Sequence, residues 1–137
     1  MGGRRVALIL SLALLACSED EAPSGVSNAA SRPPTEAPAG LTDLQWGERL
    51  FRDYGCVGCH TVHGARAVGG RLDDLWGDER TSSDGRTVTA DADYVRESIV
   101  DPDAKRVAGA SARVVSYDGV LNQAQVDALV AYIRSLR

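Results

Sequence analysis

Hydrophobic positions after residue 40 recur at intervals of three and four, which is typical of amphipathic helices. The pattern predicts a first helix after an N-cap at Thr42 or Asp43, a second over about 89–100, and a third from Asn122, where Gln125 completes a capping-box pattern. No stretch alternates convincingly enough to predict a pair of strands. The positions expected to face inward are Leu44, Gly47, Leu50, Phe51 and Tyr54, then Tyr94, Val95 and Ile99, and then Val126, Leu129, Tyr132, Ile133 and Leu136.

Two long connections, residues 61–88 and 101–121, separate these helices and are rich in Gly, Asp and Ser. Connections of that length are unusual in a small helical domain unless they enclose a bound group. The sequence therefore predicts an all-α domain over residues 41–137 whose loops wrap around a cofactor. Gly47 lowers helix stability by about 1 kcal/mol relative to Ala, so we expect it at a close helix crossing.

The N-terminal region predicts export rather than a fold. A short basic stretch at residues 2–5 precedes an apolar run, 6–16, that has the length of a secretory signal and is too short to span a bilayer. We therefore expect residues 1–16 to be a signal peptide. The run ends in LLAC, which resembles a bacterial lipobox, in which Cys17 is acylated after cleavage. The alternative is ordinary cleavage, which leaves Cys17 as a spare thiol.

Residues 17–40 would then be the lipidated N-terminus and a disordered linker. This stretch holds four of the five prolines and a single sizeable apolar residue, Val26, so it cannot bury enough surface to offset its ordering entropy. A flexible coil of this length has a root-mean-square span of roughly 25 Å. We therefore expect a domain tethered to the periplasmic face of a bacterial membrane through lipid at Cys17.

The net charge argues against one class of partner. Fifteen Lys and Arg oppose nineteen Asp and Glu, which gives a net charge of −4. Nucleic-acid binding depends on clustered cations, so we expect no nucleic-acid partner. An acidic surface favours a basic docking face on a protein partner, although the same excess is ordinary in soluble proteins. We expect the domain to be a monomer.

The candidate chemistry lies in the sequence CVGCH at residues 56–60. C-x-x-C-H is typical of c-type haem attachment, because two thiols three residues apart can each add to a haem vinyl group and the next residue places an imidazole beneath the iron. A thioredoxin-like dithiol would need a βαβ context. Zinc needs four ligands, and the candidates, Cys56, Cys59, His60 and His63, are crowded into one turn without a second segment that contributes a ligand. The motif favours one covalent haem c, with Cys56 and Cys59 as thioethers and His60 as the proximal iron ligand.

The chain resembles the class I monohaem cytochromes c, most closely the cytochrome domain fused to subunit II of some haem-copper oxidases. The similar segments are GERLFRDYGCVGCHTV, VGGRLDDLWG, DGRTVTADADYVRESIVDPDAK and YDGVLNQAQVDALVAYIRSL, which cover nearly all of 46–136. The resemblance implies a small class I fold, with three main helices and long loops around the haem. It also implies that Gly47 and Phe51 cross Leu129 and Tyr132. A cupredoxin region and paired transmembrane helices are not seen, so we expect the cytochrome module alone.

The resemblance assigns further residues to the haem pocket. A carbonyl within residues 68–70 would accept a hydrogen bond from the far nitrogen of His60, which fixes the ring and raises its basicity. Gly70 stands where the family usually has proline, so we expect a softer loop there. The haem edge would be lined by Leu72, Leu75 and Trp76, with ordinary core packing as the alternative for Trp76.

The distal side departs from the family pattern. Relatives place a methionine before a proline on the distal side of the iron, whereas alignment puts Val114 and Val115 at those two positions. Valine cannot coordinate iron. An open or water-ligated iron is our leading interpretation, with Lys105 or His63 as substitute ligands. Lys105 would first have to lose its proton, and His63 follows His60 closely enough to lie on the proximal side.

Two classes of function remain after these steps. The favoured one is a membrane-tethered electron carrier between respiratory-chain proteins, not an enzyme. The absence of methionine predicts a lower potential than Met/His ligation gives. The alternative is a haem domain that binds or senses CO, NO or peroxide at an open iron, with weak peroxidase activity. No distal His and Arg pair can be assigned that would support efficient peroxide chemistry. Beside these two classes stands a third hypothesis, a structural lipoprotein with a vestigial haem.

Overall fold

The structure is a computed structural model that describes residues 33–65, 67–110 and 112–137. The predictions for the signal peptide, for Cys17 and for the linker up to residue 32 lie outside the described residues. Among the helices of the described part, none is long and apolar enough to cross a membrane.

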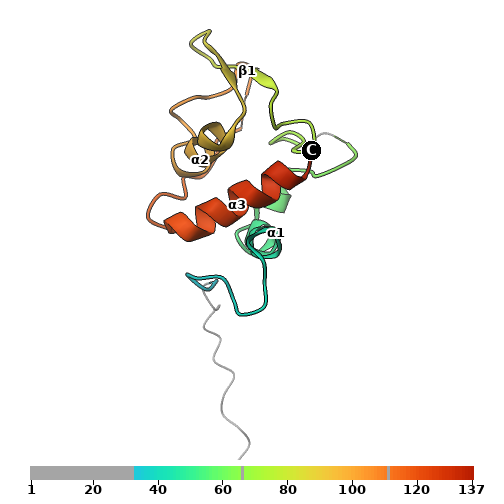
Figure 1. Cartoon of the computed structure of the whole chain (residues 1–137). Helices are drawn as coiled ribbons and strands as arrows, with labels where there is room; N and C mark the ends of the chain where they lie inside the picture. Colours follow the sequence, from blue (N-terminus) through green and yellow to red (C-terminus); the bar gives the residue numbers. More distant parts are fainter. Residues whose placement is uncertain (1–32, 66, 111) are drawn as a thin grey trace, which may run out of the picture. The chain divides into compact units, whose positions relative to one another are not determined.

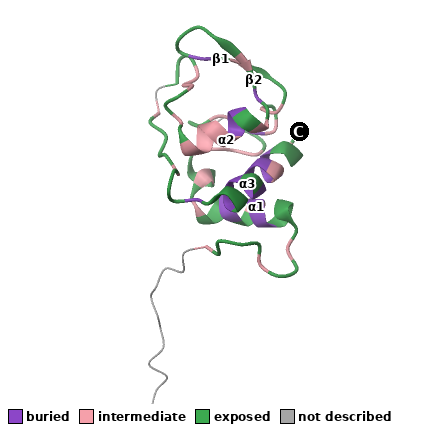
Figure 2. Cartoon of the chain, turned by 60° about the vertical axis from the view of Figure 1, so that its left-hand side comes forward, coloured by how far each residue is buried: buried purple, intermediate pink, exposed green. Residues whose placement is uncertain are grey.

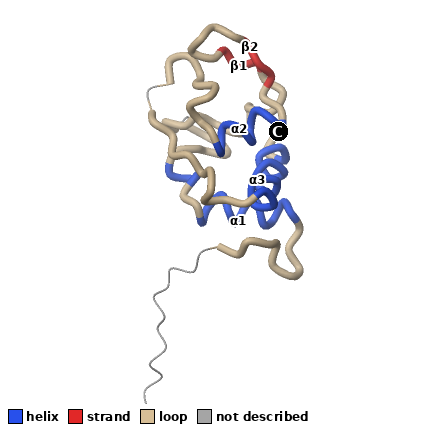
Figure 3. The backbone as a smooth tube through the Cα atoms, turned by 90° about the vertical axis from the view of Figure 1, so that its left-hand side faces the viewer, coloured by secondary structure: helices blue, strands red, loops and turns tan. Residues whose placement is uncertain are grey.

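The three predicted helices are present as α1 (Asp43–Asp53), α2 (Ala92–Val100) and α3 (Gln123–Ser135), and a short 3-10 turn, η1 (Cys56–Gly58), follows α1. Thr42 caps α1 and Asn122 caps α3, and each forms a capping box with the glutamine three residues later. These side chains satisfy amides that have no partner within the helix. α2 begins later than expected, because Asp91 caps it by accepting from the Tyr94 amide. Loops make up most of the remainder (Figure 3).

A β-hairpin corrects the expectation that no strands pair. β1 (Glu79–Thr81) and β2 (Thr87–Thr89) are antiparallel. Three residues per strand are too few to show a convincing alternation. The hairpin instead depends on its turn, where the carboxylate of Asp84 accepts from the Ser82 hydroxyl and from the Arg86 amide. The fold is therefore three helices with a small two-stranded sheet.

The centre of the fold is the crossing of α1 and α3, where the buried residues of both helices face each other (Figures 1 and 2). A Cβ on Gly47 would collide with the Ala128 carbonyl and would lie 2.8 Å from the Tyr132 Cβ. The Phe51 and Tyr132 rings are 5.5 Å apart. The close crossing at Gly47 is thus confirmed, whereas Leu44, expected to face inward, is 42% exposed.

The hairpin is joined to the loop that follows α2. The Ser83 amide donates to the Arg106 carbonyl at 2.7 Å, and the Ala108 amide donates to the Thr81 carbonyl at 2.8 Å. In Figures 1 to 3 the hairpin lies at the end of the domain away from α1. The second long loop is therefore held at the hairpin end as well as by α2.

Residues 33–41, which we call the strap, contact the start of α3. Asn122 Nδ2 donates to the Thr35 carbonyl at 2.7 Å, and Gln125 Nε2 donates to the Pro34 carbonyl at 2.9 Å. Figure 1 shows the strap in blue-green next to the N-terminal end of α3. The folded unit therefore includes residues that the sequence assigned to the linker.

Candidate functional site

A cavity of about 600 Å³ lies between the two long loops, α2 and α3, a volume typical of ligand and cofactor sites. Cys56, Cys59 and His60 line one part of its wall, and residues 105–110 and 112–115 line another. We call these parts the proximal wall and the distal wall. The helix stripes that the sequence identified as core also contribute, through Tyr94, Val95, Ile99, Leu129 and Ile133.

The proximal wall begins at η1. The amides of Cys59 and His60 both donate to the Cys56 carbonyl, at 3.1 and 2.9 Å, so one tight turn carries both thiols and the imidazole. Neither thiol forms a disulfide. Burial raises the pKa of the Cys56 thiol, so the free thiol is neutral. The turn thus offers two unpaired thiols and one imidazole to a single bound group.

The His60 ring is turned with Nδ1 toward the loop that contains Gly69. Nδ1 is buried without a formed hydrogen bond, yet the Gly70 backbone, within the predicted residues 68–70, acts on the ring as an acceptor. The expected carbonyl therefore lies near the ring, and it also accepts from the Thr61 amide at 3.3 Å. Burial lowers the pKa of His60, and the Gly70 backbone opposes this shift. The imidazole is therefore favoured in the neutral form that binds metals.

The two glycines of this loop are required for different reasons. The Gly69 amide donates to the Cys59 carbonyl at 2.6 Å, and a Cβ on Gly69 would lie 2.7 Å from the His60 Cε1. Gly70 has a φ of +85°, which proline, fixed near −65°, cannot adopt. Gly70 is therefore not a softened version of a proline loop, because its backbone has a different conformation. The sequence singled out Gly70 but gave no sign of the close approach at Gly69.

The leucines expected in the pocket line the cavity, and Gly70 does so too. Leu72 is buried and Leu75 is half-buried. Trp76 is not among the lining residues. Its ring lies beneath the Arg134 guanidinium, 5.5 Å from the ring centre, and packs against the core. Its position matches the alternative of core packing rather than a place at the haem edge.

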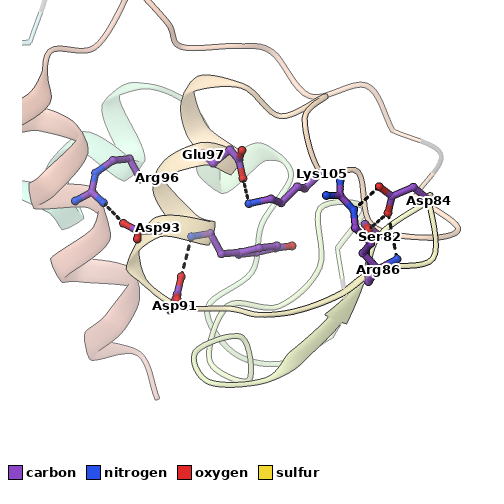
Figure 4. A network of polar contacts seen from close by, with 9 residues as sticks. Ser82, Asp84, Arg86, Asp91, Asp93, Arg96, Glu97 and Lys105 are labelled. Carbon is purple, nitrogen blue, oxygen red and sulfur yellow. Dashed lines mark hydrogen bonds and ion pairs between the residues drawn. The ribbon is translucent and has the colours of Figure 1, made fainter.

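The distal wall contains Val114, which is 51% exposed. Lys105, the single lysine of the chain, also lines the cavity, and its ammonium forms an ion pair with Glu97 of α2 (Figure 4). His63 is not part of the lining, and its side chain is 75% exposed with Nδ1 at 3.2 Å from Asp73. Of the two substitute ligands considered, only Lys105 lies at the cavity.

Arg106 stabilises the backbone of the distal wall. Its Nη1 contacts Asp103 at 3.2 Å and its Nη2 donates to the Ala110 carbonyl at 3.1 Å. The hairpin turn contains a second set of bonds, in which the Asp84 carboxylate contacts Ser82 and Arg86 (Figure 4). The bonds from Ser82 and Arg86, with the Ser82 hydroxyl bond as the largest cause, lower the pKa of Asp84 to about 2. The distal wall is thus held both by Arg106 within it and by the neighbouring hairpin.

Metal binding by a compact cluster finds no support in the described ranges, where no group of three or more His, Cys, Asp or Glu residues could hold a metal ion. The hairpin also provides no βαβ unit for a thioredoxin-like dithiol. The turn that begins at η1 instead offers two free thiols and one imidazole at the wall of a single cavity.

A family profile for cytochrome c matches residues 44–137, from α1 to the end of α3. The chain belongs to the cytochrome c family. Members of this family bind covalently attached haem c with its iron. A search of curated proteins found no match to this chain.

The residues present fit this cofactor. The unpaired thiols of Cys56 and Cys59 and the imidazole of His60 lie on the wall of one cavity. The surrounding wall is largely apolar, through side chains such as Leu72 and Leu129. The close approach of Gly69, which also lines the cavity, restricts the His60 ring.

Proposed function

We propose that this cytochrome c family member is a membrane-tethered carrier of single electrons between proteins of a respiratory chain. Cys56 and Cys59 hold the haem, and His60 is the proximal ligand of its iron. The observation that carries the proposal is the position of both unpaired thiols and the imidazole on one turn at the cavity wall. Proteins of this family are generally electron carriers.

The haem supplies a one-electron iron couple when bound. His60 would bind the iron through Nε2, because Nδ1 is buried beside Gly69. The apolar wall excludes water, which strengthens the influence of nearby charges on the site. Cys59 is exposed, so a partner protein can approach this edge of the site and exchange an electron there.

The distal side is proposed to leave the iron without a protein ligand. Val114 occupies the place of the family's methionine, and the ammonium of Lys105 is engaged by Glu97. Loss of a thioether ligand lowers the expected potential. The carrier would therefore work at a lower potential than relatives with Met/His ligation.

The location follows from the N-terminal sequence. A lipid at Cys17 and a linker would keep the domain at the periplasmic face of a membrane. The sequence likeness to the cytochrome domain of oxidase subunit II supports a respiratory partner.

Matured protein, purified from membranes, provides the test. We expect its mass to include one covalent haem, and we expect membrane fractions to reduce it and to reoxidise it. Carbon monoxide should shift the Soret band of the ferrous form quickly. A mass without haem, or no electron exchange with membranes, would refute the carrier function. Inertness to carbon monoxide would refute only the open distal position.

A further inference from the structure

The strap is joined to the domain by two side chains that also cap α3. In the capping box of α3, Gln125 Oε1 accepts from the Asn122 amide and Asn122 Oδ1 accepts from the Gln125 amide, which leaves the side-chain nitrogens of both residues for other partners. Those nitrogens donate to the carbonyls of Thr35 and Pro34. Gln125 is only 1% exposed, so its link to the strap is shielded from water.

The contacts continue from Gln125 to the cavity. Gln125 Nε2 also lies 3.3 Å from the Tyr54 hydroxyl, and the Tyr54 carbonyl accepts from the Tyr117 hydroxyl at 2.7 Å. The two tyrosine rings meet edge to face at 6.0 Å. Tyr117 lines the cavity, as do Gly55 and Cys56, which follow Tyr54 directly in the chain. The strap is thus linked to the turn that carries the first thiol.

We propose that the strap fixes the point at which the N-terminal tether leaves the domain, beside the Cys56 edge of the cavity, with Gln125 as a positioning residue. A domain held in this way presents its Cys56 edge toward a membrane-bound redox partner. The orientation rests on the proposed lipid at Cys17, whereas docking of the strap does not. Docking of the strap places residues 33–40 of the predicted linker on the domain.

Isosteric variants distinguish the hydrogen bonds to the strap from those that cap α3. Asn122→Asp and Gln125→Glu keep the oxygens that cap α3 and remove the amide donors to Thr35 and Pro34. Gln123→Glu is the matched control, because this exposed residue of α3 donates to Asp127 and not to the strap.

Limited proteolysis of the full-length holoprotein in solution tests docking. Cleavage within the strap should be slow in the wild type and in Gln123→Glu, and it should rise about fivefold for each strap bond removed, which is the usual effect of one net hydrogen bond. The haem spectrum verifies that each variant is folded, and Asn122→Asp at the exposed cap tests the claim even where Gln125→Glu fails to fold. Equal cleavage in all forms overturns the proposal.

Orientation at a membrane needs a second measurement. The lipidated holoprotein is bound to phosphatidylcholine vesicles that contain a fluorescent lipid, and quenching by the haem is recorded. The wild type and Gln123→Glu should quench equally, and the double variant should quench less, because its tether is longer. Equal quenching by all bound forms overturns the orientation. A protein that does not bind vesicles refutes the lipid tether of the proposed function, while proteolysis still decides whether the strap docks.

Discussion

The proximal and distal walls of the cavity are built in opposite ways. On the proximal wall, one turn carries Cys56, Cys59 and His60, and Gly69 contacts this turn so closely that no side chain fits. On the distal wall, the half-exposed Val114 contributes no ligand atom, and the backbone is held by contacts from the hairpin. The comparison teaches that bonds within one turn position the thiols and the imidazole, whereas the distal wall depends on contacts with the distant hairpin.

The largest effect is expected when the proximal wall loses its thiols. The double variant Cys56→Ala, Cys59→Ala has no group that can bond a haem vinyl, so its mass should show no covalent haem. Val57→Ala, an exposed neighbour within the same motif, should keep full attachment. Covalent haem in the double variant would show that the attachment site lies elsewhere.

Removing the close approach at Gly69 should be less drastic. A methyl group there would lie 2.7 Å from both the Cys59 carbonyl oxygen and the His60 Cε1, so Gly69→Ala should lower the free energy of unfolding by about 1 to 3 kcal/mol through overpacking. Denaturant unfolding of the holoprotein measures it. Gly58→Ala is the control, because a Cβ there meets nothing within 4 Å. Equal stability of the two variants would contradict the close approach at Gly69.

The distal wall should respond to a gain of ligand rather than to a loss. Val114→Met offers a thioether at the cavity and should raise the midpoint potential by on the order of 0.1 V, because axial methionine favours the ferrous form. Affinity for carbon monoxide should fall at the same time. Val57→Met, on the proximal side, should change neither. An unchanged potential in Val114→Met would mean that this position does not reach the iron.

The smallest effect concerns the hairpin that supports the distal wall. Bonds from Ser82 and Arg86 hold the pKa of Asp84 at about 2, below its ordinary value of 3.8. A lowered pKa stabilises the fold above pH 3.8, and this contribution is lost as the pH falls toward 2. Asp84→Asn should therefore unfold with a weaker pH dependence in that window. Acid titration followed by circular dichroism compares the slopes, and identical slopes would exclude this role.

Much of the fold could be predicted because its determinants are local. The sequence predicts the capping box of Asn122 with Gln125 and an N-cap at Thr42 or Asp43; the structure confirms the box and has Thr42 as the cap, which also forms a box with Gln45. The hairpin could not be found in this way, since its strands have three residues each and depend on the side chains of its turn. The docking of the strap was missed for a different reason, because its partners lie about ninety residues away in the chain.

The candidate site divides along the same line. The spacing of Cys56, Cys59 and His60 identified the cofactor, since the chemistry needs only one turn of chain. Trp76 was expected at the haem edge but lies under Arg134 near the end of α3, because an aromatic side chain packs equally well against a core or a cofactor.

The sequence by itself determined the haem attachment motif, the three helices and the absence of a methionine at position 114, because each is a property of neighbouring residues. Only the tertiary structure decided that Gly69 contacts His60, that Lys105 and not His63 lies at the cavity, and that the strap belongs to the domain. These features depend on pairs of residues far apart in the chain, whose contacts form only when the whole domain closes around its cavity.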